Sequence, residues 1–243
     1  MPRMKRRIND IFYSLQGEGY HTGRPAVFVR FAGCNLRCPF CDTAFDTYRE
    51  MTDDEILTEI SRYEVRGTRY ENTMEADSSE GSNLAPRTSH LAPRKPLVVL
   101  TGGEPTLQVD EAFVDLLHGH GFKVARESNG TRPAPQTLDW LTVSPKTTEG
   151  ARYEVRGARI PDEIKIVFDE DTDPEAFLAP LESNLASRTS HLAPRKSPLL
   201  YLQPCDTGDA NRNASVINRC IDYIKAHPQW RLSLQTHKLA GFK

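Results

Sequence analysis

Five apolar runs along this chain each end in a short polar cluster, and this arrangement restricts the fold more than any other feature of the sequence. The clusters are TGGE after PLVVL, ESNG after FKVAR, SPK after DWLTV, QPCD after PLLYL and QTHK after WRLSL. Segments with helical periodicity, at residues 51–63, 109–122 and 213–228, alternate with these runs. Alternation of strand and helix predicts a parallel sheet, in which polar side chains at the carboxyl ends of the strands share one edge. We therefore expect an α/β fold, a partial parallel (β/α)6-type TIM-like barrel with one site at that edge.

The size and charge of the chain narrow its class. Its 243 residues fit one large domain, 1–243, because single α/β barrels reach this length. The formal net charge is -2, which offers no broad positive field for nucleic acid. No apolar run is long enough to span a bilayer, and no secretory leader follows Met1. We expect a cytoplasmic protein that binds neither nucleic acid nor membrane.

Two kinds of segment depart from the alternation because they repeat with a period of seven residues. YEVRGTR at Tyr63–Arg69 recurs as YEVRGAR at Tyr153–Arg159. LAPRTSHLAPR at Leu84–Arg94 recurs as LASRTSHLAPR at Leu185–Arg195. Glycine and proline inside the repeats exclude a coiled coil.

A seven-base DNA unit, read in successive frames, would encode these repeats. We therefore interpret them as products of expanded DNA repeats, a hypothesis that scattered codon choices in the gene would contradict. Long loops are tolerated because the entropy of loop closure grows slowly with length. We expect inserted surface loops at residues 62–95, 150–159 and 182–196, and no metal ligand at His90 or His191.

Three of the five cysteines, Cys34, Cys38 and Cys41, crowd into eight residues with the spacing C-x3-C-x2-C. In a reducing compartment such a group indicates metal binding rather than disulfide formation. One interpretation is a zinc site completed by a distant histidine or by Cys205, and another is a set of structural thiols. A third is an iron–sulfur cluster with one iron left without a protein ligand. We otherwise expect Cys205 and Cys220 to be structural.

The cysteine spacing, with an aromatic residue just before the last cysteine, resembles the signature of the radical S-adenosylmethionine (SAM) superfamily. The resemblance implies that the three cysteines hold a [4Fe-4S] cluster, that SAM binds the fourth iron, and that the fold is the partial barrel of this superfamily. It also implies that reductive cleavage of SAM gives a 5′-deoxyadenosyl radical, so that no separate catalytic side chain is assigned. Residues that match the superfamily's SAM contacts are Phe40, Asp42, Gly102, Gly103, Glu104, Ser144, Pro145, Lys146, Gln203 and Asp206.

Longer segments resemble one family of this superfamily, the 7-carboxy-7-deazaguanine synthases. They are SLQGEG, CNLRCPFCDT, TGGEPTLQ, TVSPK and LQTHK, and the resemblance covers the chain outside the repeats. The family pattern ETNGT stands here as ESNGT, Glu127–Thr131, which keeps the hydroxyl group. The resemblance implies conversion of 6-carboxy-5,6,7,8-tetrahydropterin to 7-carboxy-7-deazaguanine with loss of ammonia, on the route to queuosine and related deazapurines.

The same resemblance implies a magnesium ion and a set of substrate contacts. Thr43 matches the magnesium ligand, although a neutral hydroxyl needs substrate oxygens and water to complete the coordination. Gln16 and Glu18 can read the donor and acceptor edge of a pterin, and Arg30 can bind a carboxylate through two hydrogen bonds. A glycine turn and an ordinary strand-end arginine are the structural alternatives. The residues expected to bind substrate are Leu15, Gln16, Gly17, Glu18, Arg30, Thr101, His237 and Lys243.

Two other functions stay open at this point. One is a radical SAM activase that makes a glycyl radical on a partner protein, and the other is a non-catalytic zinc or iron–sulfur binding module. A brown colour after anaerobic purification separates a cluster from zinc, and dependence on pterin and magnesium separates the two enzymes. For a synthase, the resemblance implies a homodimer and a low-potential electron donor, a flavodoxin or a ferredoxin-like protein.

Overall fold

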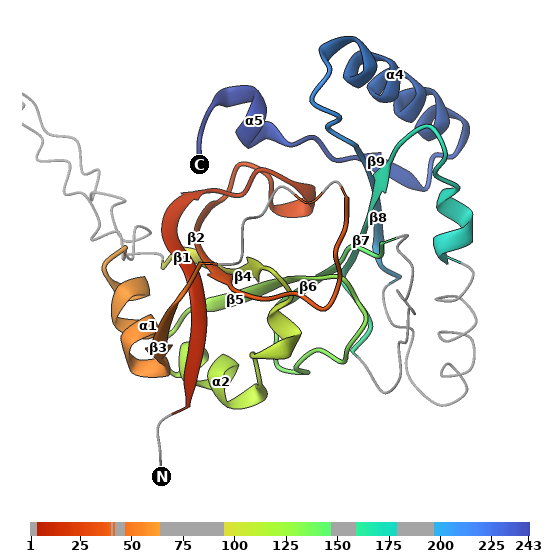
Figure 1. The fold of residues 1–243 in the computed structure, drawn as a ribbon. Coiled ribbons are helices and arrows are strands. Elements are labelled where there is room, and N and C mark those ends of the chain that lie inside the picture. Colours follow the sequence, from red (N-terminus) through yellow and green to blue (C-terminus); the bar gives the residue numbers. More distant parts are fainter. Residues whose placement is uncertain (1–3, 40, 42–46, 64–94, 147–158, 179–196) are drawn as a thin grey trace, which may run out of the picture.

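A computed structural model describes residues 4–39, 41, 47–63, 95–146, 159–178 and 197–243. Within them, one sheet is flanked by helices (Figure 1), and none of these helices is long and apolar enough to cross a membrane. The strands are β1 (Lys5–Leu15), β2 (Pro25–Phe31), β3 (Arg49–Thr52), β4 (Leu97–Gly102), β5 (Lys123–Ser128), β6 (Trp140–Val143), β7 (Glu163–Phe168), β8 (Leu199–Pro204) and β9 (Trp230–Leu232). The helices are α1 (Asp53–Ser61), α2 (Glu111–Gly119), α4 (Ala210–Ala226) and α5 (Thr236–Ala240), with short 3-10 turns η1 (Gly19–His21) and η2 (Pro105–Leu107).

The strands lie in the order β3-β1-β2-β4-β5-β6-β7-β8-β9. Every neighbouring pair from β2 to β9 is parallel, as the alternation predicted. β1 pairs antiparallel with both β2 and β3, which the alternation did not predict. The physical reason is that β1 returns into β2 through a short loop, whereas a parallel partner needs a long crossover. The fold is a mixed α/β fold with a mostly parallel sheet.

Alternate side chains of the central strands point to opposite faces of the sheet. Helices α1 and α2 cover one face, and we call the opposite face, on which the pocket lies, the open face. Val29 of β2 and Leu100 of β4 are fully buried on the face that α1 and α2 cover. Phe28 lies on the opposite face, in a smaller apolar cluster. Two residues after Phe28, Arg30 lies on that same face, beside Thr101 of β4 in the parallel register. The open face therefore changes from apolar to polar toward the carboxyl ends of its strands.

Local sequence signals set where the first two helices begin. Thr52 accepts a hydrogen bond from the amide of Glu55, whose carboxylate accepts one in return from the amide of Thr52. Asp110 caps α2 in a similar way, through the amide of its third residue. Arg6 of β1 is buried and pairs with Asp53 at the start of α1 and with Asp110. This arginine therefore ties the starts of both helices to β1.

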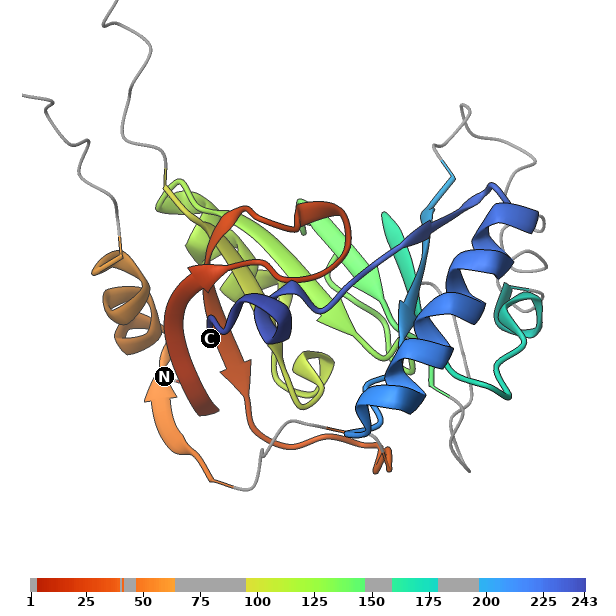
Figure 2. The ribbon, with the colours of Figure 1, turned by 90° about the horizontal axis from the view of Figure 1, so that it is seen from above.

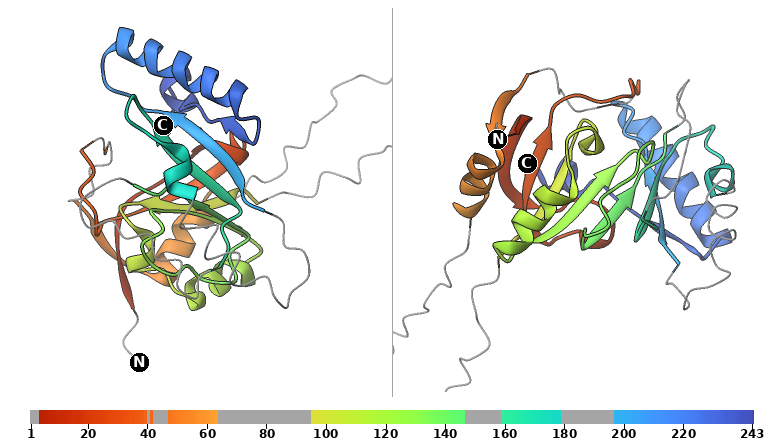
Figure 3. Two further views of the ribbon diagram at one scale, coloured as in Figure 1. Left: turned by 90° about the vertical axis from the view of Figure 1, so that its right-hand side faces the viewer. Right: turned by 90° about the horizontal axis from the view of Figure 1, so that it is seen from below.

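The last segment of the chain crosses the open face of the curved sheet (Figure 2). The amide of Ser233 donates to the carbonyl of Leu202 in β8, and the ammonium of Lys243 lies 2.6 Å from the carboxylate of Asp10 in β1. Strand β9 covers only the first three residues of the WRLSL run, and most of the QTHK cluster that follows lies in α5. Helix α4 packs on β8 and β9, away from α1 and α2 (Figure 3).

The three predicted repeat insertions fall almost entirely outside the described residues, so their expected loop structure stays a prediction. Their edges are described. Tyr63 stacks on Tyr13 of β1, with ring centroids 5.8 Å apart. Arg159 donates to the carbonyl of Leu138 and pairs with Asp162. The ends of these segments therefore contact the sheet and its loops.

Candidate active site

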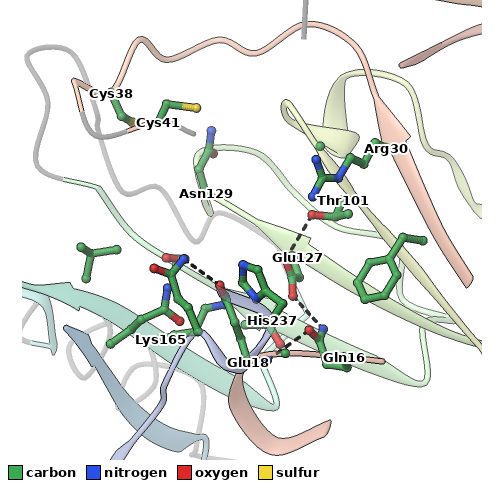
Figure 4. Close-up of a pocket in the computed structure, with 18 of the residues that line it drawn as sticks. Gln16, Glu18, Arg30, Cys38, Cys41, Thr101, Glu127, Asn129, Lys165 and His237 are labelled. Carbon is green, nitrogen blue, oxygen red and sulfur yellow. Dashed lines mark hydrogen bonds and ion pairs between the residues drawn. The ribbon is translucent and has the colours of Figure 1, made fainter. Parts of the chain in front are cut away.

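A pocket lies over the polar part of the open face, at the predicted carboxyl edge of the parallel strands (Figure 4). The strand register arranges its floor, because Arg30 of β2 lies beside Thr101 of β4, and Glu127 of β5 beside Thr142 of β6. Residues predicted from the sequence that line this pocket are Leu15, Gln16, Gly17, Glu18, Arg30, Cys34, Cys38, Cys41, Thr101, Gly102, Gly103, Ser144, Lys146, Gln203, Asp206, His237 and Lys243.

Five predicted site residues do not line the pocket or are not placed. Phe40, Asp42 and Thr43 lie outside the described residues, so the SAM and magnesium contacts expected there stay predictions. Pro145 is buried and is not among the residues that line the pocket. Glu104 is fully buried, and its carboxylate is engaged by the protein interior. Any contact between SAM and the TGGEP turn would therefore involve main chain rather than the Glu104 carboxylate.

The three clustered cysteines lie together at the wall of the pocket. The amide of Leu36 donates to the sulfur of Cys34 at 3.4 Å. Burial raises the pKa of both Cys34 and Cys38. Across the part of the chain that is described, no three His, Cys, Asp or Glu side chains are grouped to hold a metal ion. Three thiols at one pocket wall match the donor set of a [4Fe-4S] cluster in which three irons each take one cysteine thiolate.

The TGGEP turn packs directly against the start of the cysteine loop, main chain to main chain. The amide of Gly103 donates to the carbonyl of Phe31 at 2.8 Å, and the amide of Glu104 donates to that of Gly33 at 2.9 Å. Gly102 has a φ of +107°, which only glycine adopts readily. A Cβ atom on Gly103 would lie 2.0 Å from the carbonyl oxygen of Gly33. Two glycines are therefore required for this close approach.

We expect Gly103→Ala to lower the free energy of unfolding of the apoprotein by about 1–3 kcal/mol or more, because the added methyl group meets main chain that cannot rotate away. Urea unfolding under reducing conditions measures this change. Gly119→Ala is the matched control, because a Cβ atom at Gly119 meets nothing within 4 Å. Equal unfolding midpoints for the two variants would contradict the tight approach.

The buried carboxylate of Glu104 holds the ESNGT turn in place behind the pocket. It accepts hydrogen bonds from the Ser128 hydroxyl at 3.0 Å, from the Asn129 amide at 2.7 Å and from the Thr106 amide at 2.9 Å. Arg126 lies 3.6 Å away and is also fully buried. Burial lowers the pKa of Arg126 to about 10, although Glu104 acts in the opposite direction. The glycine turn and the ESNGT turn thus form one unit.

Glu127 is a pocket residue for which the sequence predicted no role. Its carboxylate accepts hydrogen bonds from Thr101 Oγ1 at 3.1 Å and from Gln16 Nε2 at 3.0 Å (Figure 4). Glu127 begins the ESNG cluster, so the rule that placed Thr101 at the site, a polar residue at the end of a buried strand, also selects Glu127. The guanidinium of Arg30 lies 5.3 Å from the ring centroid of Phe12, and no described carboxylate forms an ion pair with it.

A buried network of charges forms the opposite wall. Lys165 of β7 donates to one oxygen of Glu18, and Gln235 donates to the other at 3.1 Å. Burial alone would raise the pKa of Glu18, but Lys165, Gln235 and His237 together outweigh burial and lower this pKa to about 2. Burial would lower the pKa of Lys165, but Glu18 and Glu127 outweigh it and raise that pKa. Nearby, burial raises the pKa of Glu163 to about 7. Of these residues, only Glu18 was expected from the sequence to contact substrate.

The C-terminal segment lines the pocket and contacts two of its loops. Thr236 donates to the carbonyl of Gly17 through both its amide and its hydroxyl. Lys238 donates to Asp206 at 3.0 Å and lowers the pKa of that carboxyl group to about 2. Lys243, predicted to contact substrate, lines the pocket at the end of this segment.

The loops after β6 and β8 supply the remaining polar wall. Lys146 donates to Ser144 Oγ at 2.7 Å, and burial lowers the pKa of Lys146. Gln203 accepts a hydrogen bond from Ser233 Oγ at 3.2 Å. Cys205, which we expected to be structural, also lines the pocket, whereas Cys220 is buried in the apolar cluster beneath α4, in keeping with that expectation.

Comparisons with known proteins cover almost the whole chain, although no protein-family model matches it. The chain is 42% identical over 240 residues to the 7-carboxy-7-deazaguanine synthase of Bacteroides thetaiotaomicron, covering 99% of this chain and 100% of the relative. It is 39% identical over 254 residues to the synthase of the same name from Bradyrhizobium diazoefficiens, covering 99% and 100%. Among solved structures, the crystal structure of QueE from Escherichia coli superposes with a TM-score of 0.65 at 28% identity, covering 95% of this chain and 94% of that one.

Proposed function

Because this chain belongs to the 7-carboxy-7-deazaguanine synthase family, we propose that its pocket is the place where cluster, SAM and pterin meet. The protein is a radical SAM lyase of queuosine biosynthesis that converts 6-carboxy-5,6,7,8-tetrahydropterin to 7-carboxy-7-deazaguanine. Its family membership implies a [4Fe-4S] cluster and SAM as cofactors. The observation that supports the site assignment most strongly is that the three cysteines, the glycine turn and Arg30 line one pocket.

We assign the cluster to Cys34, Cys38 and Cys41, which leaves one iron for SAM. When bound, the cluster and SAM supply the radical chemistry, and the chain supplies orientation and exclusion of water. The amide groups of Gly103 and Glu104 already donate within the protein. The turn therefore offers carbonyl oxygens, which are acceptors suited to the ammonium group of SAM. Gln203, Asp206, Ser144 and Lys146 line the same pocket and complete the proposed contacts.

The substrate is proposed to lie over the floor of the pocket between Arg30 and the wall that contains Glu18. Arg30 presents a planar pair of donors that suits the pterin carboxylate. Glu127, held by Thr101 and Gln16, presents acceptor oxygens to the ring N–H groups. Lys165 and Gln235 fix Glu18 in one orientation, so these acceptors are arranged before substrate arrives.

Several further assignments remain proposals. We propose a magnesium ion held by Thr43 together with substrate oxygens and water, which removal of magnesium from the assay tests. The curved, mostly parallel sheet is proposed to be the partial (β/α)6-type barrel of the superfamily, and residues 1–243 a single domain with three repeat insertions. A cytoplasmic homodimer and a flavodoxin or ferredoxin-like donor are likewise proposed. The activase and binding-module alternatives lack support, because the relatives that match the full chain are synthases.

An anaerobic turnover assay with a variant of Arg30 tests both the substrate and the pocket. The reconstituted protein receives SAM, dithionite, magnesium and 6-carboxytetrahydropterin, and mass spectrometry detects the deazaguanine. For Arg30→Met we expect the KM for pterin to rise about 10–100-fold, because hydrogen bonds to charged groups contribute about 1.5–3 kcal/mol. Arg132→Met is the control, because Arg132 is exposed and does not line the pocket.

Three outcomes of this assay are distinct. If the unmodified protein cleaves SAM but forms no deazaguanine, the assignment of the pterin as substrate is wrong. An unchanged KM for pterin in Arg30→Met would contradict only the placement of Arg30. Equal changes in Arg30→Met and Arg132→Met would indicate a general charge effect rather than a substrate contact.

A further inference from the structure

The ESNGT motif is joined to the cysteine loop by a closed ring of three polar side chains. Asn129 Nδ2 donates to Asn35 Oδ1 at 3.0 Å, and Asn35 Nδ2 donates to Thr131 Oγ1 at 2.8 Å. Thr131 Oγ1 then donates to Asn129 Oδ1 at 2.7 Å, which closes the ring. Asn35 lies between Cys34 and the rest of the cysteine loop, so the ring joins that loop to the end of β5.

The hydrogen bonds of this ring determine which way the Asn129 amide faces. The main-chain amide of Thr131 can only donate, and it lies 3.0 Å from Asn129 Oδ1. The oxygen of Asn129 must therefore face Thr131, and its nitrogen must face the cysteine loop. Figure 4 shows the Asn129 side chain directed toward the loop that contains Cys38 and Cys41. Asn129 is also only 8% exposed, so water does not compete freely for its hydrogens.

The second hydrogen of Asn129 Nδ2 points to a cysteine sulfur. One hydrogen is used by Asn35, and the sulfur of Cys34 lies 4.0 Å from the same nitrogen. The amide of Leu36 lies 3.4 Å from that sulfur. Cys34 Sγ is therefore an acceptor for main-chain N–H groups, of Leu36 and Asn35, and for the side-chain N–H of Asn129. Of these donors, only the side chain can be removed by substitution.

We propose that Asn129 is a positioning residue that hydrogen-bonds the Cys34 sulfur and raises the reduction potential of the cluster. This inference rests on the proposed function, because it requires the cluster at the three cysteines. Reduction adds negative charge to a cluster and its thiolates, and N–H donors stabilise that added charge. The radical chemistry begins with one electron entering this cluster. The reduction potential therefore decides what fraction of the enzyme holds a reduced cluster that can cleave SAM.

The main chain of Asn129 is itself held by a buried hydrogen bond, so its side chain can keep a constant orientation toward Cys34. Its main-chain amide donates to Glu104 at 2.7 Å, and Glu104 belongs to the turn proposed to meet SAM. A displacement of this turn would therefore move the donor to Cys34 and the SAM contacts together. Asn129 thus hydrogen-bonds both the Cys34 sulfur and the turn that is proposed to contact SAM.

A redox titration of the reconstituted protein, followed by electron paramagnetic resonance of the reduced cluster, tests the proposal. For Asn129→Leu we expect a midpoint potential more negative than that of the unmodified protein, because the donor is lost. Asn129→Asp is nearly isosteric and retains the acceptor for Thr131, and we expect a further negative shift because an anion replaces the donor. Thr131→Val is the matched control: it opens the ring, but the Thr131 amide still orients Asn129, so we expect an unchanged potential.

The outcomes separate this inference from the proposed function. An unmodified protein that takes up no iron would overturn the cofactor assignment and this inference with it. A loaded Asn129→Leu or Asn129→Asp protein with the unmodified potential would overturn the inference alone. Equal shifts in the Asn129 variants and in Thr131→Val would also overturn it, because the ring rather than the N–H donor would then set the potential.

Discussion

Cys38→Ala is expected to purify without the brown colour of a cluster and to form no detectable deazaguanine. The substitution removes one of the three clustered thiolates at the pocket wall. Besides these three, Cys205 is the only described cysteine that lines the pocket. A cubane that has lost one of three protein ligands is not retained, so SAM has no iron to bind. Iron and sulfide analysis, together with the anaerobic turnover assay, measures both losses in one preparation.

Cys220→Ala is the matched control for this experiment. Cys220 is fully buried under α4, in an apolar cluster apart from the pocket. Removing its sulfur leaves a small cavity and costs some stability, but it should leave iron content and turnover unchanged. A Cys38→Ala protein with full iron content and turnover would overturn the cluster assignment. Equal losses in both variants would indicate that thiol removal damages the fold rather than the site.

The sheet and the location of the site could be predicted because both follow from local patterns. Apolar runs such as PLVVL alternate with segments of helical periodicity, which predicts parallel strands with helices packed on the sheet. The polar residue that ends each run then lies at one edge of the sheet. This rule placed Thr101 and Gln203 at the pocket, and applied consistently it would also have placed Glu127 there.

The contacts that complete the site could not be predicted, because they join segments that are distant in sequence. Lys165 and Glu18 are 147 positions apart, and Gln235 is 217 positions from Glu18. The alternation of side chains along a strand places each residue on one face of the sheet. Which residue it pairs with depends on how the loop after β1 and the C-terminal segment cross that face. The helix at residues 236–240 also depends on this crossing, because Thr236 donates to the carbonyl of Gly17.

Lys165→Met is expected to lower the free energy of unfolding of the apoprotein by about 3–5 kcal/mol at neutral pH, because breaking a buried ion pair leaves an uncompensated charge. The side chain of Lys165 is 6% exposed and that of its partner Glu18 is 16% exposed. Glu127 and Glu163 also lose a favourable charge interaction. Lys123→Met is the control, because Lys123 is 70% exposed and pairs with Asp139 at the surface, where ion pairs contribute about 0–1 kcal/mol.

The pH dependence of this loss distinguishes a charge effect from a packing effect. In the unmodified protein the pKa of Glu18 is about 2, below its unfolded value, so its stabilising contribution is present above pH 4.5 and is lost as the pH falls toward 2. Without Lys165, burial, the largest single influence on this pKa, is opposed only by Gln235 and His237, so we expect the pKa of Glu18 to rise above its unfolded value, as burial raises that of Glu163. The variant then becomes less stable as the pH rises, so the difference between the two proteins should be larger at pH 8 than at pH 5 in urea unfolding. Glu18→Gln combined with Lys165→Met should recover part of the loss at pH 8, because no charge then remains unpaired at that position. A difference that is independent of pH and is not relieved by Glu18→Gln would show that Lys165 acts through packing alone.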